Sequence, residues 1–165
     1  MTPEQFVKTY YPFAKKMQDK NGISAIFILA QSALESGWGE KAVGNMMFGV
    51  KASSKTPEDK RQLITTTEYL KTANVKFPEV ISVVKQPSGL FKYKVKDWFR
   101  KYDTPEESFS DHADFFLKNP RYSEALKVKS DPVLFAEAIA AAKYATDPNY
   151  AETLKLMVNS VKKRL

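Results

Sequence analysis

The most hydrophobic stretch of the chain is Ser24–Gly39, with the sequence SAIFILAQSALESGWG. Ala25–Ala30 is apolar at every position, and the length and the Ala, Leu and Gln content of the stretch favour a helix over a buried strand. A helix that is apolar on all sides lies inside a domain, so we expect it at the centre of the fold. Ser24 is suited to cap its start, and Gly37 to end it in the left-handed conformation.

Apolar positions at helical spacing predict four further helices around this segment. Their expected starts are residues 2–5 (TPEQ), residues 104–107 (TPEE), Asp131-Pro132 and Asp147-Pro148. The first two starts carry a capping-box pattern, in which the side chains of the first and fourth residues bond to each other's backbone. Each start also places a proline at the first helical position, where its missing N–H removes no hydrogen bond.

The pattern changes at about residues 61–102, where β-branched and aromatic residues are frequent. Gln62–Leu70, Val80–Val84 and Leu90–Phe99 read as strands, and the turn residues QPSG at 86–89 join the last two as a hairpin. We therefore expect a small antiparallel β-lobe inserted between helices.

A chain of 165 residues is long enough for one domain with a real hydrophobic core. No internal repeat and no linker divides it, so a single domain is predicted over residues 1–165. The predicted fold class is α+β, with a helical body around the central helix and the small β-lobe beside it.

Glu35 is an ionisable residue on the last turn of the apolar helix. Burial raises the pKa of a carboxyl group, and the negative end of the helix dipole acts in the same direction. A carboxyl group that stays protonated near neutral pH can act as a general acid. The alternative is a solvated glutamate at a frayed helix end, and the position alone leaves both interpretations open.

Four sequence blocks resemble one known family. They are AQSALESGWG (30–39), NMMFGVKA (45–52), ITTTEY (64–69) and YATDPNYA (144–151). In this order they resemble the flagellar-type glucosaminidase domain of glycoside hydrolase family 73, also described as mannosyl-glycoprotein endo-β-N-acetylglucosaminidase-like. The resemblance extends from about residue 22 to the C-terminus. It implies a lysozyme-like fold and an enzyme that cuts the glycan strands of bacterial peptidoglycan.

Hydrolysis of a glycosidic bond usually takes two carboxyl groups. The resemblance implies that Glu35 is the catalytic acid and that Glu68, in the β-lobe, is its partner across a cleft. Glu68 would position or activate water, or stabilise the transition state. Asp111, in the block EESFSDH, matches a family aspartate linked to activity. By sequence alone, Glu68 reads as a solvent-facing strand residue and Asp111 as a surface or capping charge.

Five residues are candidates for binding the glycan: Trp38, Asn45, Phe48, Tyr144 and Tyr150. Trp38 and Phe48 could stack on sugar rings, or they could cover the end of the central helix. The two tyrosines flank a turn that resembles a family block approaching the glycan, although the turn could also simply anchor the last helix. Of the two, we expect Tyr144 to contact the ligand.

One position departs from the family pattern. Met46 stands where family members often carry a polar or aromatic residue, and Asn45 could serve in its place. This departure bears on fine substrate preference and leaves the expected reaction unchanged.

The net charge of +7 suits a polyanionic partner. Because no nucleic-acid-binding motif accompanies it, we read the charge as attraction to an acidic wall polymer or as a solubilising surface. His112 is the only histidine and cysteine is absent, which argues against a metal site and against a Ser–His–Asp triad. No cofactor is indicated, and we expect a monomer.

No apolar run is long enough to cross a membrane, and the N-terminus shows no signal-peptide pattern. The predicted place of action is the bacterial cell wall. The protein would reach it without the general secretion route, as a phage or prophage lysin does, or with a leader that this sequence lacks.

These observations predict an endo-β-N-acetylglucosaminidase that cleaves the β-1,4 bond after N-acetylglucosamine. A muramidase is one alternative. A lytic transglycosylase is another, and it would need Glu35 but no second carboxylate. A non-catalytic domain that binds cell wall is the alternative from a different class.

Overall fold

The computed structural model describes all 165 residues, which form two compact units. The helical unit comprises residues 1–48 and 102–165, and the sheet unit comprises residues 49–101. The helices of the helical unit are α1 (Pro3–Asn21), α2 (Ala25–Ser36), α3 (Pro105–Lys118), α4 (Pro132–Ala141) and α5 (Tyr150–Lys162), joined by short 3-10 turns at Val43–Asn45, Pro120–Tyr122 and Ala125–Val128. None of these helices is long and apolar enough to cross a membrane.

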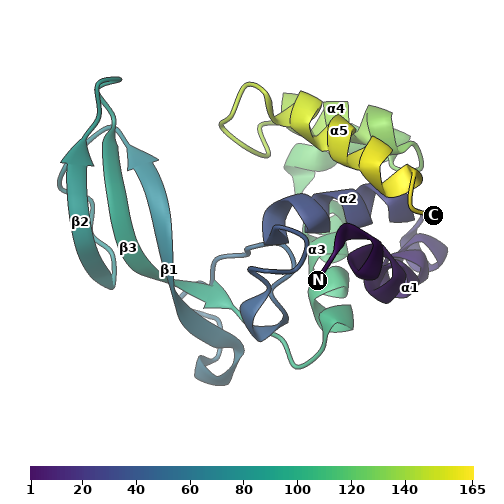
Figure 1. Cartoon of the computed structure of the whole chain (residues 1–165), viewed down its shortest axis with the longest axis horizontal. Coiled ribbons are helices and arrows are strands. Elements are labelled where there is room, and N and C mark those ends of the chain that lie inside the picture. The colour runs from purple at the N-terminus through teal and green to yellow at the C-terminus, as the bar shows by residue number, and fades with distance from the viewer. The chain divides into compact units, whose positions relative to one another are not determined.

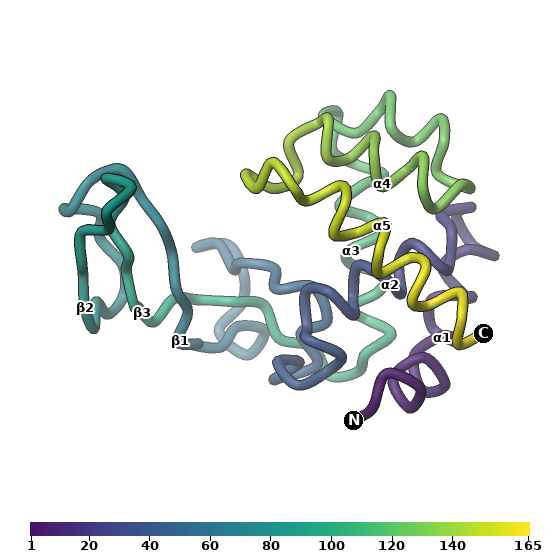
Figure 2. Tube along the Cα trace, turned by 45° about the horizontal axis from the view of Figure 1, so that its top comes forward, coloured from purple at the N-terminus to yellow at the C-terminus, as the bar shows by residue number.

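Helix α2 is the central element of the helical unit. Nine of its 12 residues are buried. It packs against α1 on one side and against α4 and α5 on the other, as the ribbon and the tube views both show (Figures 1 and 2). The Ser24 hydroxyl accepts a hydrogen bond from the Phe27 N–H at 3.2 Å, and Gly37 ends the helix at φ +58°. The predicted central helix is therefore confirmed, including both of its boundaries.

The expected caps of the other helices are partly confirmed. At α1, Thr2 and Gln5 form the full capping box, with hydrogen bonds of 3.1 Å and 2.8 Å. At α3, Thr104 accepts from the Glu107 N–H, but the Glu107 carboxylate accepts from the Asp103 N–H at 3.1 Å. The second box therefore differs from the expected one in a single bond: the Glu107 carboxylate accepts from the N–H of Asp103, the residue before the cap, and not from that of Thr104.

The predicted start of the last helix at Asp147-Pro148 was wrong. Helix α5 begins at Tyr150, and Pro148 lies in the turn before it. The Asp147 carboxylate accepts from the Asn149 N–H at 2.8 Å. This bond to the second residue along the chain makes a local turn of the kind that aspartate favours, so Asp147 shapes the turn and does not cap the helix.

The sheet unit contains three antiparallel strands, β1 (Arg61–Leu70), β2 (Glu79–Lys85) and β3 (Phe91–Arg100). Their spatial order is β1-β3-β2, with β3 in the middle (Figure 1). The hairpin expected at residues 86–89 joins β2 to β3 and is closed by a hydrogen bond from the Gln86 N–H to the Leu90 carbonyl at 2.7 Å.

The sheet unit starts earlier than residue 61, where the strand pattern begins in the sequence. Lys51 forms an isolated bridge with Phe99, and the Ala52 N–H donates to the Trp98 carbonyl at 3.0 Å. Residues 49–60 therefore belong to the unit through backbone bonds to β3. Polar, turn-rich residues give no periodicity from which such pairing could be predicted.

The start of α4 provides a test of capping. One carboxylate oxygen of Asp131 accepts from the N–H groups of Val133 and Leu134, both at 3.0 Å. Asp131→Ala should lower the free energy of unfolding by about 1 kcal/mol, since two backbone donors lose their partner. Asp131→Asn keeps a side-chain oxygen and should lose less. Urea unfolding followed by circular dichroism measures both variants, and equal losses would contradict the capping role.

Candidate active site

The chain turns sharply directly after Glu35, at the end of α2. Gly37, Trp38 and Gly39 all have positive φ, at 58°, 57° and 90°. For tryptophan this conformation is strained, and the N–H of Trp38 is held by the Ala33 carbonyl at 2.9 Å. The Ser36 hydroxyl also accepts from the Gly39 N–H at 3.0 Å. The helix end that carries Glu35 is therefore fixed by its own backbone bonds.

Glu35 meets Tyr150, the first residue of α5. The Tyr150 hydroxyl donates to the Glu35 carboxylate at 2.9 Å, and the Tyr150 side chain is 6% exposed. Burial raises the pKa of Glu35 above its ordinary value, and the hydrogen bond from Tyr150 lowers it by less. Burial, and then the charge of Glu35, raises the pKa of Tyr150 well above its usual range, so the tyrosine is a neutral donor.

Gln31 lies one helical turn before Glu35 and also contacts Tyr150. Its amide N–H donates to the Tyr150 hydroxyl at 3.0 Å, and its side chain is fully buried. Sequence reasoning did not single out Gln31. The available signal was a lone amide within an apolar helix, since a buried polar group must find a partner.

Tyr144 joins the same group from the segment before α5. Its ring centroid lies 5.5 Å from that of Tyr150. Burial, and then the charge of Glu35, raises the pKa of Tyr144 well above its usual range. The structure thus brings together Glu35, Tyr144 and Tyr150, three of the residues that the sequence singled out.

The two other aromatic candidates pack elsewhere in the helical unit. Phe48 is 4% exposed and stacks on His112, with 3.9 Å between ring centroids. Trp38 packs edge-on against Phe6 of α1 at 5.6 Å, and the Arg164 guanidinium lies over its ring at 5.7 Å. Both side chains are therefore engaged in contacts within the protein. Their role in binding sugars stays a prediction.

Asn45 and Asp111 both bond to Tyr102. The Asn45 amide donates to the Tyr102 carbonyl at 3.0 Å, and the Tyr102 hydroxyl donates to the Asp111 carboxylate at 2.6 Å. The Tyr102 N–H in turn donates to the Gly44 carbonyl at 2.9 Å. This network ties the 3-10 turn at Val43–Asn45 to α3, which is the structural contribution of both candidates.

Glu68 lies in β1 of the sheet unit, opposite Tyr93 of β3. From Gln62 to Leu70 the even-numbered residues are less exposed than the odd-numbered ones, so Glu68 is on the more buried face of β1. Its carboxylate pairs with the Lys51 ammonium at 2.7 Å, and Lys51 also pairs with Asp97 at 3.3 Å. Glu68 is therefore a partly exposed strand residue in an ion pair, with 27% of its side chain exposed.

Lys51 and Asp97 were not among the sequence candidates. Burial lowers the pKa of Lys51, but hydrogen bonds and charges of Glu68 and Asp97 raise it by more, so the net pKa is above the ordinary value. The lysine is thus a fixed positive charge between two carboxylates. Lys51 precedes β1 and Asp97 lies in β3, so only the pairing of the strands brings them to Glu68.

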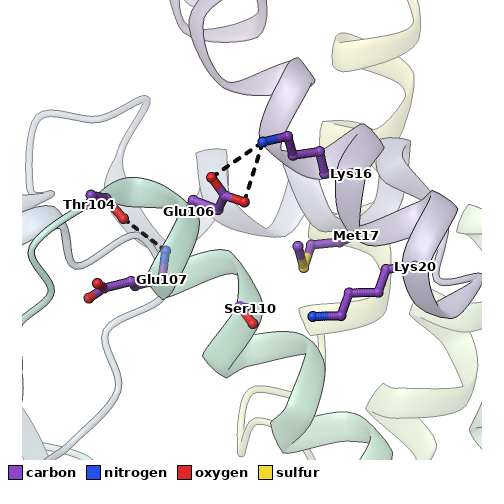
Figure 3. A pocket seen from close by; sticks show the side chains of 7 residues that line it. All are labelled: Lys16, Met17, Lys20, Thr104, Glu106, Glu107 and Ser110. Atoms are coloured by element: carbon purple, nitrogen blue, oxygen red, sulfur yellow. Dashed lines mark hydrogen bonds and ion pairs between the residues drawn. The ribbon is translucent and has the colours of Figure 1, made fainter.

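A surface cavity of about 590 Å³ lies between α1 and α3 (Figure 3). Its lining residues are Lys16, Met17, Lys20, Thr104, Glu106, Glu107 and Ser110. Lys16 and Glu106 form an ion pair at 3.4 Å across it. The cavity contains none of the predicted site residues, so it is separate from the group around Glu35.

Comparison with known sequences places the chain among glycoside hydrolases. Residues 11–163 match the family Glucosaminidase, described as mannosyl-glycoprotein endo-beta-N-acetylglucosaminidase. The peptidoglycan hydrolase FlgJ of Vibrio parahaemolyticus is 34% identical over 157 residues, which cover 92% of this chain and 45% of that protein. A probable N-acetylmuramidase of Lactococcus lactis subsp. lactis is 29% identical over 167 residues, which cover 94% and 33%. The chain thus spans less than half the length of these relatives.

A solved structure has the same fold. The glycoside hydrolase domain of Salmonella typhimurium FlgJ matches with a TM-score of 0.71 and 31% identity, covering 99% of this chain and 90% of that one. The likeness confirms the predicted α+β, lysozyme-like fold class. The family match extends over nearly the whole chain, and the resemblance of the four sequence blocks is confirmed with it. The chain belongs to the glucosaminidase family.

Proposed function

We propose that this chain is a peptidoglycan hydrolase domain that cleaves the β-1,4 bond after N-acetylglucosamine in the glycan strands of bacterial cell wall. One observation carries the proposal: Glu35, held at the end of the buried helix α2, has a raised pKa and a single tyrosine donor. Membership of the glucosaminidase family and relatives named peptidoglycan hydrolases support the reaction and its substrate.

Glu35 would act as the general acid. Its partly buried carboxyl group keeps a proton to a higher pH than a solvated glutamate does, because the protein around it disfavours the charge. That proton would pass to the glycosidic oxygen as the leaving group departs. Tyr150 and Tyr144, both neutral, would shape the surroundings of the acid, and we propose Tyr144 as the glycan contact.

Glu68 would act as the second carboxylate. It lies in an ion pair with Lys51 at 2.7 Å, and its carboxylate would activate water or stabilise an oxocarbenium-like transition state. Asp111 and Asn45, through Tyr102, would support the site by fixing the loop that leads into α3. The net charge of +7 would favour association with anionic wall polymers.

A muramidase is the second candidate function. The Lactococcus lactis relative named as a probable N-acetylmuramidase supports it, at 29% identity. Both enzymes would use the same acid and would differ only in which sugar carries the new reducing end.

Digestion of purified peptidoglycan, with mass spectrometry of the fragments, tests the proposal. The wild type should release fragments that end in reducing N-acetylglucosamine. Glu35→Gln should lower the rate by about 10²–10⁴-fold, since amide nitrogen donates no proton of comparable acidity. Glu68→Gln should also be strongly impaired. Glu40→Gln, on the exposed turn after α2, and Glu79→Gln, in an exposed ion pair with Lys96, are the matched controls and should retain activity.

Each other outcome of this digestion points to a different function. Reducing muramic acid ends would establish the muramidase. Anhydro-muramic ends, together with an active Glu68→Gln, would indicate a lytic transglycosylase. If the wild type releases no fragments from walls of several sources, the chain is a binding module and the proposed hydrolysis is refuted.

The hydrogen bond from Tyr150 predicts a pH effect with a definite sign. A general acid works when protonated, so activity falls as the pH rises through the pKa of Glu35. The Tyr150 hydroxyl lowers that pKa. Tyr150→Phe should therefore move the alkaline limb of the activity profile to higher pH. The rate of wall clearing measured between pH 4 and pH 9 checks this, and a limb that stays in place or moves to lower pH would contradict it.

A further inference from the structure

His112 is a buried titratable side chain that the proposed reaction does not use. It lies in α3, is 2% exposed and stacks on Phe48 with 12° between the ring planes. Its Nε2 is 2.6 Å from the side-chain oxygen of Gln31, and its Nδ1 is buried without a hydrogen-bond partner. A phenylalanine could stack on Phe48 without leaving a polar atom unsatisfied. The contact with Gln31 is therefore the one interaction here that an imidazole can make and a phenylalanine ring cannot.

The contact determines the protonation of His112. An amide oxygen only accepts hydrogen bonds, so Nε2 must carry the hydrogen that is donated to Gln31. Burial lowers the pKa of His112 from 6.5 to about 3, so the ring is neutral at ordinary pH and Nδ1 carries no hydrogen. The ring is thus held as a single tautomer, with its one N–H directed at Gln31.

The tautomer of His112 sets the direction of every bond that follows. With its oxygen turned to His112, the Gln31 amide presents its N–H to the Tyr150 hydroxyl at 3.0 Å. The Tyr150 oxygen is then an acceptor from Gln31, and its single hydrogen is available to Glu35 at 2.9 Å. If Gln31 were turned over, its oxygen would take the tyrosine hydrogen and Glu35 would lose its donor.

We propose that His112 and Gln31 are positioning residues, which direct the Tyr150 hydroxyl at Glu35 and so fix the geometry and the proton affinity of the acid. The proposal rests on the proposed function in one respect, since it takes Glu35 as the acid. The bonds themselves do not depend on which sugar is cut. His112 and Gln31 act through Tyr150 and do not touch the substrate.

The two tyrosines in contact with this hydrogen-bond chain stay neutral over the working range. The pKa values of Tyr144 and Tyr150, which both interact with Glu35, are raised well above their usual range. The remaining rings against His112 are those of Phe48, Phe115 and Phe116, with Tyr144 edge-on at 6.2 Å. A change in the titration of Glu35 on replacing His112 would therefore report the hydrogen-bond chain.

Nitrogen-15 NMR of the wild-type protein tests the tautomer directly. His112 is the only histidine, so a histidine-labelled sample gives one imidazole. The proposal predicts a protonated Nε2 and an unprotonated Nδ1, unchanged between pH 8 and pH 5. A protonated Nδ1, or a ring that gains charge near pH 6.5, would overturn the proposal without any variant having to fold.

Variants test the action on Glu35. His112→Phe keeps a stacking ring but removes the donor, so Gln31 can turn over and take the Tyr150 hydrogen. The titration of Glu35, followed by carbon-13 NMR of labelled glutamate, should move up by about half to one pH unit. His112→Gln can again present an N–H to Gln31. The titration of Glu35 in this variant should therefore return most of the way to its wild-type position. In a Tyr150→Phe background, His112→Phe should add nothing further, since its effect passes through the hydroxyl.

The two proposals fail in different ways. The positioning role is overturned if His112→Phe leaves the titration of Glu35 unchanged. It is also overturned if His112→Phe shifts that titration equally when Tyr150→Phe is already present. In either case His112 would be only a core residue. A shift as predicted in a protein that cleaves no peptidoglycan would leave the positioning role standing and refute the proposed function. If the protein is active, the alkaline limb of its pH–activity profile should move by the same amount as the NMR titration of Glu35.

Discussion

The burial of the apolar helix α2, which carries Glu35 on its last turn, is the constraint on which the helical unit depends. Helix α2 is hydrophobic on nearly every side, so α1, α4 and α5 must cover it. The same covering removes water from the last turn, where Glu35 lies, and raises its pKa. One packing requirement therefore produces both the core and the perturbed acid. The left-handed residues after α2 confine the carboxyl group to that turn.

A polar amide within this core needs partners that packing must supply. Gln31 is fully buried, and leaving its donors and acceptor unsatisfied would cost about 1–3 kcal/mol or more. Helix α3 supplies His112 and helix α5 supplies Tyr150, so three helices meet at one side chain. The packing of the helices and the orientation of the Tyr150 hydroxyl are therefore coupled. A small shift of α3 or α5 would change the donor that Glu35 receives.

The two carboxyl groups proposed for catalysis lie in different environments. Glu35 is surrounded by apolar and neutral groups, which favour its protonated form. Glu68 lies in an ion pair with the Lys51 ammonium at 2.7 Å. Pairs of carboxyl groups whose surroundings differ in this way divide the roles of acid and base between them. In the sheet unit, strand pairing brings Lys51 and Asp97 to the face of β1 that carries Glu68.

The sequence by itself determined the elements whose causes are local. The apolar run, its serine cap and its glycine stop predicted α2 and placed Glu35 on its last turn, and the strand pattern with QPSG predicted the hairpin. The wrong start of α5 arose because Asp147 has two local uses, a cap or a turn, and only the surrounding packing selects one. Only the tertiary structure showed that Gln31 contacts Tyr150 and His112, and that Lys51 pairs with Glu68. Their partners are 17 to 119 residues away in the chain, and no periodic pattern records contacts over such distances.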